Sequence, residues 1–230
     1  MGNGMNKILP GLFVGNFRDA KDEEQLEQNN ITHILSIHDN ARPLLADKKY
    51  LCIYASDTPG QDLMPYFRQC AMFIHEARTG GGSVLVHCLA GVSRSVTVTV
   101  AYIMTVTGHT WRDTLNAVRQ SRTVANPNYG FQTQLQKYEE EKVVEERKWF
   151  SETYGHNTLG DQLSIKELSK QYEENSQQNL VERNSNLEAQ PSGSTSASYP
   201  LNKPDEMLPS AWDKAKRIGM LVDDYDPSIE

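Results

Sequence analysis

The sequence predicts an α/β fold in which a central, mostly parallel sheet is flanked by helices. Residues 83–86 form a short apolar run, rich in β-branched residues, directly after the chain-breaking glycines at 80–82. Residues 95–106 form an apolar run too long for a typical strand, and Gly108 can end it as a helix. The order strand, loop, helix is that of a buried parallel strand leading into a crossover helix. Burial has to override the low helix propensity of the β-branched residues in the second run.

The remaining elements follow from the spacing of apolar residues. Residues 63–78 have apolar side chains at helical intervals, namely Met64, Phe67, Ala71, Ile74 and Ala77. In chain order, the patterns predict a strand over residues 10–16, a helix over 23–29, strands over 31–37 and 50–53, and helices over 63–78, 111–121 and 128–154. Open α/β sheets bind ligands at the carboxyl ends of their strands. We therefore expect a site after the strand at 83–86.

Composition divides the chain of 230 residues into a domain at 1–155 and a tail at 156–230. Most of the net charge of −7 belongs to the tail, and residues 173–204 are dominated by Asn, Gln, Ser, Glu and Pro. Such a segment cannot bury enough apolar surface to offset its ordering entropy, so we expect the tail to be disordered. Residues 210–222 have some helical spacing and are a candidate for folding on a partner. The absence of a Lys/Arg stripe disfavours nucleic-acid binding.

The run HCLAGVSRS, from His87 to Ser95, has the features of a phosphate-binding loop that contains a nucleophile. A loop that closes onto a helix start can turn its N–H groups toward phosphoryl oxygens. The predicted phosphate-binding residues are Leu89, Ala90, Gly91, Val92, Ser93 and Arg94. Inward amides and a nearby guanidinium can lower a thiol pKa from about 8.5 to roughly 3.5–7.5, which makes Cys88 a thiolate nucleophile. Arg94 would grip two phosphoryl oxygens with its planar fork. The alternative is a buried, inert cysteine with a surface arginine.

HCLAGVSRS resembles the signature loop of the cysteine-dependent protein tyrosine phosphatases, and VHCLAGVSRSVT followed by AYIMT resembles their dual-specificity branch. The stretches MGNGMNKILPGLFVGN and ITHILSIHD are similar to the small atypical dual-specificity phosphatases linked to JNK signalling, which are N-myristoylated and lack a kinase-docking domain. The resemblance covers residues 1–155. It implies a phosphatase-like α/β fold, a catalytic domain at 1–155, and hydrolysis of phosphotyrosine and phosphoserine or phosphothreonine in MAP-kinase signalling.

This chemistry needs an acid that protonates the leaving oxygen and then activates water to release the phosphocysteine. Asp57 follows the predicted strand at 50–53 in a turn-prone stretch, and it matches the position of the family's general acid. Asp62 is the rival candidate. The alternative for Asp57 is a turn or helix-cap role, since Asp is common at such positions.

Supporting roles are assigned to three further residues. The resemblance implies that the Ser95 hydroxyl helps the thiolate leave, and that Asn126 buttresses the pocket loop through hydrogen bonds. The alternatives are a first-turn helix residue for Ser95 and a turn residue before Pro127 for Asn126. His87 is expected to stabilise the thiolate through its ring, with a hydrogen-bonded core histidine as the alternative.

No cofactor is expected, and the histidine spacing predicts no metal. Three cysteines, an odd number, and the lack of a secretory segment fit a reducing compartment. Cys52 and Cys70 are interpreted as buried, with the option that one of them caps an oxidised Cys88. The expected location is the cytoplasm, with the nucleus and the inner face of the plasma membrane as further sites, and we expect a monomer.

Met1-Gly2 and the small residues after it resemble an N-myristoylation signal, although Asn6 stands where Ser or Thr is preferred. The resemblance favours acylation of Gly2. A single acyl chain gives only weak, reversible membrane binding.

The substrate class follows from the loop, where Leu89, Ala90, Val92 and Ser93 supply no extra cation for a polyphosphorylated lipid. A phosphoprotein is therefore the expected substrate and partner, with MAP-kinase pathway components implied by the resemblance. Two alternatives remain, a non-catalytic phosphoprotein-binding module and a rhodanese-like sulfur transferase.

Overall fold

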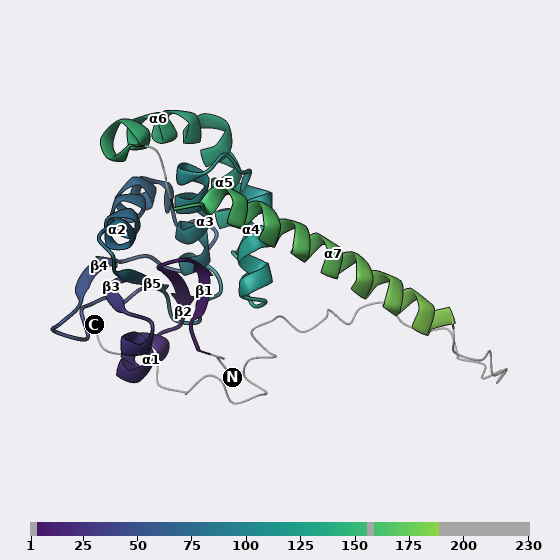
Figure 1. Ribbon diagram of the computed structural model, residues 1–230, viewed down its shortest axis with the longest axis horizontal. Helices are drawn as coiled ribbons and strands as arrows, with labels where there is room; N and C mark the ends of the chain where they lie inside the picture. Colours follow the sequence, from purple (N-terminus) through teal and green to yellow (C-terminus); the bar gives the residue numbers. More distant parts are fainter. Residues whose placement is uncertain (1–3, 156–158, 189–230) are drawn as a thin grey trace, which may run out of the picture. The chain divides into compact units, whose positions relative to one another are not determined.

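A computed structural model describes residues 4–155 and 159–188 and contains one five-stranded sheet (Figure 1). Its strands are β1 (Asn6–Leu9), β2 (Leu12–Gly15), β3 (Ile31–Ile37), β4 (Lys49–Ile53) and β5 (Ser83–His87). They lie in the order β1-β2-β5-β3-β4. Only β1 is antiparallel to its neighbour; the other pairs are parallel. The strand before the HCLAGVSRS loop is therefore the central one.

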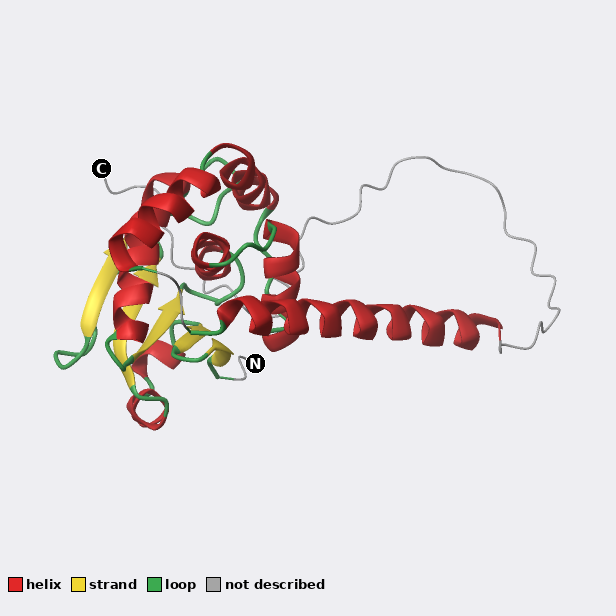
Figure 2. Ribbon diagram, turned by 45° about the horizontal axis from the view of Figure 1, so that its top comes forward, coloured by secondary structure: helices red, strands yellow, loops and turns green. Residues whose placement is uncertain are grey.

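Helices cover both faces of this sheet (Figures 1 and 2). The described helices are α1 (Glu23–Gln28), α2 (Phe67–Thr79), α3 (Arg94–Val106), α4 (Trp111–Ser121), α5 (Tyr129–Glu141), α6 (Val143–Tyr154) and α7 (Asp161–Glu188), with short 3-10 helices η1 (Asp19–Lys21) and η2 (Met64–Tyr66). Helix α1 lies on one face, and α2 to α6 lie on the other. No helix in the described ranges is both long and apolar enough to cross a membrane.

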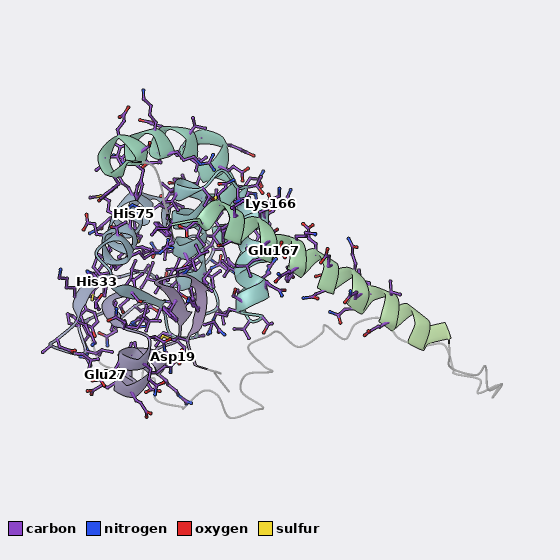
Figure 3. All side chains as sticks on the ribbon, viewed as in Figure 1. Asp19, Glu27, His33, His75, Lys166 and Glu167 are labelled. Carbon is purple, nitrogen blue, oxygen red and sulfur yellow. The ribbon has the colours of Figure 1, made fainter. Side chains whose placement is uncertain are left out.

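Alternating side chains of the strands build two apolar clusters, one on each face of the sheet. Leu85 packs with Phe13 and with Leu26 of α1, whereas its neighbours Val84 and Val86 point into the larger cluster under α2 and α3. Figure 3 shows side chains filling the space between the sheet and the helices. Burial on both faces explains why the middle of β5, residues 84–86, is a continuous apolar run.

Several predicted elements are confirmed with the same or nearly the same bounds, and others need correction. β3 and α4 have the predicted ends, and β4, β5, α1 and α3 differ by one residue at an end. The strand predicted over 10–16 is confirmed as the shorter β2, since Pro10 and Gly11 form a turn, but its hairpin partner β1 was not predicted. The helix predicted over 63–78 starts as η2, where Pro65 lies in the first turn.

The helix predicted over 128–154 is helical but is not a single helix, since it divides into α5 and α6 at Lys142. The backbone of Lys142 has φ −128° and ψ −34°, which interrupts the helical run. Val143 and Phe150 of α6 are buried in the same core as Phe131 and Leu135 of α5. The break lets both helices bury an apolar face against the domain.

The predicted tail differs from the structure over residues 161–188, which form α7. Disorder was expected because this segment is polar, yet Ile165 is fully buried in the main core. Asp161 forms a buried ion pair with Arg78 of α2, with a distance of 2.7 Å between Asp161 Oδ1 and Arg78 Nη2. Residues 189–230, including the segment at 210–222, lie outside the described residues.

Candidate active site

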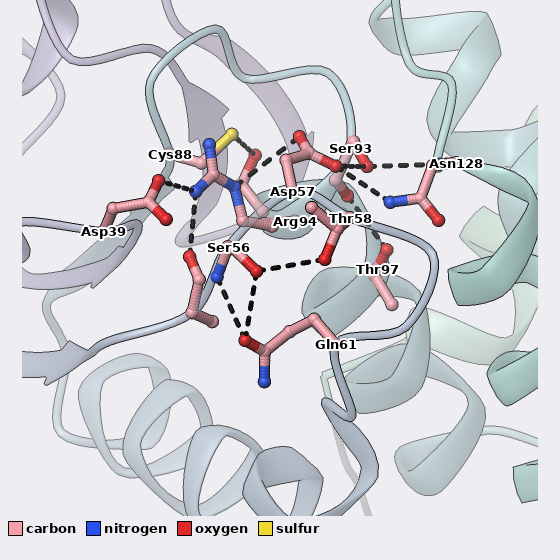
Figure 4. A network of polar contacts seen from close by, with 12 residues as sticks. Asp39, Ser56, Asp57, Thr58, Gln61, Cys88, Ser93, Arg94, Thr97 and Asn128 are labelled. Carbon is pink, nitrogen blue, oxygen red and sulfur yellow. Dashed lines mark hydrogen bonds and ion pairs between the residues drawn. The ribbon is translucent and has the colours of Figure 1, made fainter. Parts of the chain in front are cut away.

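The candidate site is built on the loop that joins β5 to α3, defined here as the phosphate loop, residues His87 to Ser95 (Figure 4). Strand β5 lies between β2 and β3, so the loop leaves the sheet at its centre. Helix α3 starts at Arg94, and Val96, Val98 and Val100 of its first turns are fully buried in the core. This burial stabilises a helix that its β-branched residues disfavour, and it fixes where the loop ends.

The Cys88 thiol lies inside the phosphate loop and is only 1 % exposed. The N–H of Gly91 donates to Cys88 Sγ at 3.2 Å, and the hydroxyl of Ser95 lies 3.3 Å from the same sulfur. Burial would raise the pKa of Cys88, but hydrogen bonds from the Ser95 hydroxyl and from main-chain N–H groups of Ser95, Val92 and Gly91 outweigh it and lower the pKa. The site therefore favours a thiolate.

Every carbonyl from Leu89 to Val92 accepts a hydrogen bond from outside the phosphate loop. The donors are the Phe17 N–H to Leu89, the Arg122 guanidinium to Ala90 and Gly91, and the Asn126 N–H to Val92, at distances of 3.2, 3.4, 2.7 and 2.8 Å. Gly91 has a φ of +68°, a conformation that favours glycine. With its carbonyls directed outward, the loop can turn its N–H groups toward an anion.

Arg94 is 4 % exposed, and its guanidinium extends toward Cys88 (Figure 4). Its Nη1 donates to Asp39 Oδ2 and to the Ala55 carbonyl, both at 2.8 Å. The hydrogen bond to Arg94 holds the pKa of Asp39 below its usual value. Arg94 Nε is buried and has no hydrogen-bond partner within the described ranges. A buried charged donor without a hydrogen bond is costly, and an oxyanion bound here would accept one.

Asp57 lies at the edge of the site in a segment we call the acid loop, residues 56–61. Its Oδ2 is 3.5 Å from Arg94 Nε. Its Oδ1 accepts hydrogen bonds from Ser93 Oγ at 2.6 Å and from Asn128 Nδ2 at 2.9 Å (Figure 4). The rival Asp62 is exposed and accepts from the N–H of Met64 at 3.0 Å, as a residue at a helix start does. Of the two carboxylates, Asp57 is the one held beside Arg94.

His87 is fully buried, and its Nδ1 lies 3.2 Å from the Cys88 carbonyl oxygen. Because a carbonyl can only accept, Nδ1 donates. Burial lowers the pKa of His87 to about 4, against a raising effect of this hydrogen bond. The ring is therefore neutral near neutral pH and bonds the main chain of the nucleophile, which differs from the expected direct contact with the thiolate.

The structure brings Cys88, Arg94, Ser95 and Asp57 together. Asn126 contacts the loop through its main-chain N–H, as described above, while its side chain is exposed. Gly2 lies outside the described residues. Cys52 and Cys70 are free thiols. Within residues 4–155 and 159–188, no group of three or more His, Cys, Asp or Glu side chains could hold a metal ion.

Sequence reasoning missed three residues that contact this site: Asn128, Asp39 and Arg122. Asn128 caps α5 by accepting from the Phe131 N–H, and an Asn at the start of a predicted helix was a signal for that cap. Its contact with Asp57 had no signal in the sequence. Asp39 and Arg122 reach the site only through the tertiary fold.

Comparison with known proteins gives a consistent result. The family model "Dual specificity phosphatase, catalytic domain" matches residues 12–141. Dual specificity protein phosphatase 22 of Xenopus tropicalis is 61 % identical over 168 residues, covering 73 % of this chain and 80 % of the relative. The human protein of the same name is 58 % identical over 168 residues, covering 73 % of this chain and 91 % of the relative.

Solved structures agree with these similarities. The crystal structure of DUSP15 has a TM-score of 0.65 and 49 % identity, covering 68 % of this chain and all of that chain. The crystal structure of the human tyrosine phosphatase-like serine/threonine/tyrosine-interacting protein has a TM-score of 0.56 and 36 % identity, covering 60 % of this chain and 96 % of that chain.

Proposed function

Because the chain belongs to the dual-specificity phosphatase family and is a protein phosphatase of that type, we propose that it acts through a phosphocysteine intermediate formed on Cys88. The observation that carries the proposal is the environment of the sulfur. Cys88 Sγ accepts the Gly91 N–H and lies against the Ser95 hydroxyl, while the neighbouring carbonyls are bonded outward. This environment favours the thiolate and leaves main-chain donors for a phosphoryl group.

In the first step, the thiolate attacks phosphorus, so that the S–P bond forms and the P–O ester bond breaks. Arg94 and the loop N–H groups neutralise charge on the three phosphoryl oxygens. Asp57 gives its proton to the leaving oxygen, and its place beside Arg94 supports this role. Arg94 Nε, which makes no hydrogen bond within the described residues, donates to the bound phosphoryl group.

In the second step, Asp57 takes a proton from water, and the water oxygen attacks phosphorus. The S–P bond breaks and the thiolate is restored. A hydrogen bond from Ser95 stabilises the sulfur as it regains its charge, and the 3.3 Å contact between the two side chains supports this role. Ser93 and Asn128 position the Asp57 carboxylate throughout.

Replacement of the nucleophile tests the mechanism. Cys88→Ser should abolish turnover of an aryl phosphate while retaining binding of a phosphotyrosine peptide, because the phosphate loop is unchanged. Cys52→Ser, at a half-buried cysteine on β4, is the matched control and should turn over normally. Retained turnover in Cys88→Ser would refute the phosphocysteine mechanism. The wild-type assay in the same experiment separates this enzyme from a non-catalytic binding module, because the unaltered protein would show no turnover if it were such a module.

Phosphoproteins are the substrate class of this family. We propose that this chain acts on MAP-kinase pathway components of the JNK branch, on the strength of the resemblance in its N-terminal half. Phosphopeptides captured from cell extract by Cys88→Ser test this, and a captured set without such components would refute it.

We also propose that Gly2 is acylated, that the protein is a monomer, and that it is found in the cytoplasm, in the nucleus and at the inner face of the plasma membrane. Mass spectrometry of the N-terminal peptide from eukaryotic cells tests the first point, and an unmodified Gly2 refutes it. Sedimentation and imaging of the expressed protein test the others.

A further inference from the structure

Arg122 links the phosphate loop to the N-terminal segment, and the mechanism above does not use it. It follows α4 directly and is 4 % exposed. On one side, its Nε donates to the Gly91 carbonyl at 2.7 Å and its Nη2 to the Ala90 carbonyl at 3.4 Å. On the other side, its Nη1 donates to Asn6 Oδ1 at 2.6 Å and to the Gly4 carbonyl at 3.3 Å. One guanidinium therefore spans both segments.

The contact between Arg122 and the phosphate loop leaves little room for movement. A Cβ atom at Gly91 would lie 2.6 Å from Arg122 Nη2 and would also meet the Gly15 carbonyl of β2. A shift of the guanidinium would therefore displace Gly91, whose N–H donates to Cys88 Sγ. Burial lowers the pKa of Arg122, and the charges of Asp19 and Cys88 act in the opposite direction, so Arg122 and Cys88 interact electrostatically.

Asn6 provides the shortest of the four contacts that hold this guanidinium. It lies on β1, the edge strand, where it pairs with Val14 of β2. Its amide oxygen accepts a hydrogen bond from a charged donor, and such bonds are stronger than neutral ones. A Ser or Thr hydroxyl ends one atom closer to the main chain, which gives a physical reason for Asn where an acylation signal prefers those residues.

We propose that Asn6 is a positioning residue of the active site and acts through Arg122. By holding the guanidinium, Asn6 fixes the Ala90 and Gly91 carbonyls outward and the Gly91 N–H on the sulfur. The geometry of the segment Gly4–Asn6 is in this way transmitted to the nucleophile. The proposal rests on the proposed role of Cys88.

Two substitutions of nearly equal size test the proposal at Asn6. Asn6→Leu removes the acceptor, whereas Asn6→Asp keeps an oxygen at that place. The exposed neighbour Lys7 supplies the control Lys7→Ala. We expect Asn6→Leu to lower kcat/KM for an aryl phosphate about tenfold, the effect of losing one hydrogen bond to a charged group. The kcat/KM of Asn6→Asp should stay within about threefold of the wild-type value, and that of Lys7→Ala should equal the wild-type value.

Alkylation of Cys88 by iodoacetate across a pH series separates positioning from a purely structural role. Asn6→Leu should move the alkylation midpoint upward by about 0.5–1 pH unit, because the sulfur loses part of its stabilisation. A variant that melts at lower temperature but keeps the wild-type midpoint and kcat/KM when folded overturns the proposal.

A double-mutant cycle adds a second criterion. Arg122→Lys keeps the charge but loses the planar fork, so Asn6→Leu should add little to its effect. Independent, additive losses would mean that Asn6 does not act through Arg122. If Cys88→Ser remains active, the mechanism itself has failed; if Cys88→Ser is inactive and Asn6→Leu behaves as the wild type, only the role of Asn6 has failed.

Discussion

The carboxylates of Asp57 and Asp62 lie in neighbouring turns but have different partners. Asp57 is bonded by Ser93 and Asn128 beside Arg94, and Asp62 accepts from the Met64 N–H. Asp57→Asn should lower kcat for phenyl phosphate by about 10²- to 10⁴-fold, the contribution of a general acid, and should change the pH dependence of kcat. Asp62→Asn should leave both unchanged. Steady-state kinetics over a pH series measures this, and an unaltered profile in Asp57→Asn would assign the proton to another group.

The buried His87 predicts a pH dependence of folding stability. Its pKa in the folded protein is lowered from 6.5 to about 4, first by burial and also by the nearby His38. Between these values the unfolded chain binds a proton that the folded chain does not, so stability is lost as pH falls from 6.5 toward 4. From pH 7 to pH 5 this group should cost about 2 kcal/mol.

Urea denaturation at pH 7 and pH 5 measures the contribution of His87. His87→Asn keeps an N–H donor and removes the titrating ring, so its stability should fall about 2 kcal/mol less than that of the wild type over this range. If the wild type and His87→Asn lose the same unfolding free energy between pH 7 and pH 5, the ring is protonated in the folded state or does not titrate in this interval.

The sequence could assign a residue to the active site when its contacts are local. Cys88, Arg94 and Ser95 lie in one short loop between a strand and a helix, so their proximity follows from the local pattern. Asp57 was found through the family resemblance. Asn128 and Arg122 reach the site from segments after α3. Their distances depend on how α4 and α5 pack, which no local pattern encodes.

At the scale of elements, α5 holds the acid loop in place in this structure. Gln134 Nε2 donates to the Gln61 carbonyl at 2.7 Å, and its Oε1 accepts from the Leu63 N–H at 2.8 Å. Gly130, in the first turn of α5, packs directly on Pro59, since an added Cβ would lie 2.6 Å from Pro59 Cα. These contacts of α5 thus fix where the acid loop holds Asp57.

This packing predicts that a methyl group at Gly130 disturbs catalysis. Gly130→Ala should push Pro59 and with it Asp57 away from the phosphate loop. A displacement of about 1 Å can lower kcat about 10²-fold. Gly60→Ala, in the same loop but with nothing within 4 Å of the added atom, is the matched control and should be nearly neutral. Kinetics with an aryl phosphate of poor leaving group compares them, and equal rates would show that the acid loop adjusts freely.

Element prediction succeeded where burial was simple. β3 and β5 contribute side chains to both apolar clusters, and their Val, Ile and Leu residues marked them as strands. The hairpin of β1 and β2 was missed because β1 contains polar Asn6 and Lys7, and Asn6 is used to bind Arg122. The division of α5 from α6 was missed because the amphipathic pattern continues on both sides of Lys142, and only the backbone at that residue changes.

At the scale of the whole molecule, β1 near the N-terminus and α7 after residue 155 each bind the catalytic domain through a buried arginine. β1 contacts the loop through Arg122. The start of α7 is bound by Arg78, whose guanidinium donates to both Asp161 oxygens and to the Tyr102 hydroxyl. Both side chains of the pair are at most 1 % exposed. A boundary at residue 155 therefore separates two partners of one buried ion pair.

The pair makes a prediction that distinguishes stability from catalysis. Removing one partner leaves a buried charge uncompensated, so Asp161→Ala should lower the free energy of unfolding by about 3–5 kcal/mol. Glu167→Ala, at an exposed position of the same helix, should cost less than about 0.5 kcal/mol. In both variants kcat for an aryl phosphate should be unchanged under conditions where the protein is folded, because none of the described side chains of α7 contacts the site.

Truncation completes this test. Ending the chain after Gly155 removes Asp161 together with the buried Ile165, and it should lower the melting temperature while the folded fraction keeps its turnover of a small substrate. In the truncated chain, water can reach Arg78 and solvate its charge. The unpaired Arg78 should therefore lower the free energy of unfolding less in the truncated chain than in Asp161→Ala. Ending the chain after Glu188 retains the pair and is the control. A loss of kcat in folded protein ending at Gly155 would place α7 in the catalytic machinery, and an unchanged melting temperature in Asp161→Ala would mean that the ion pair does not anchor the helix.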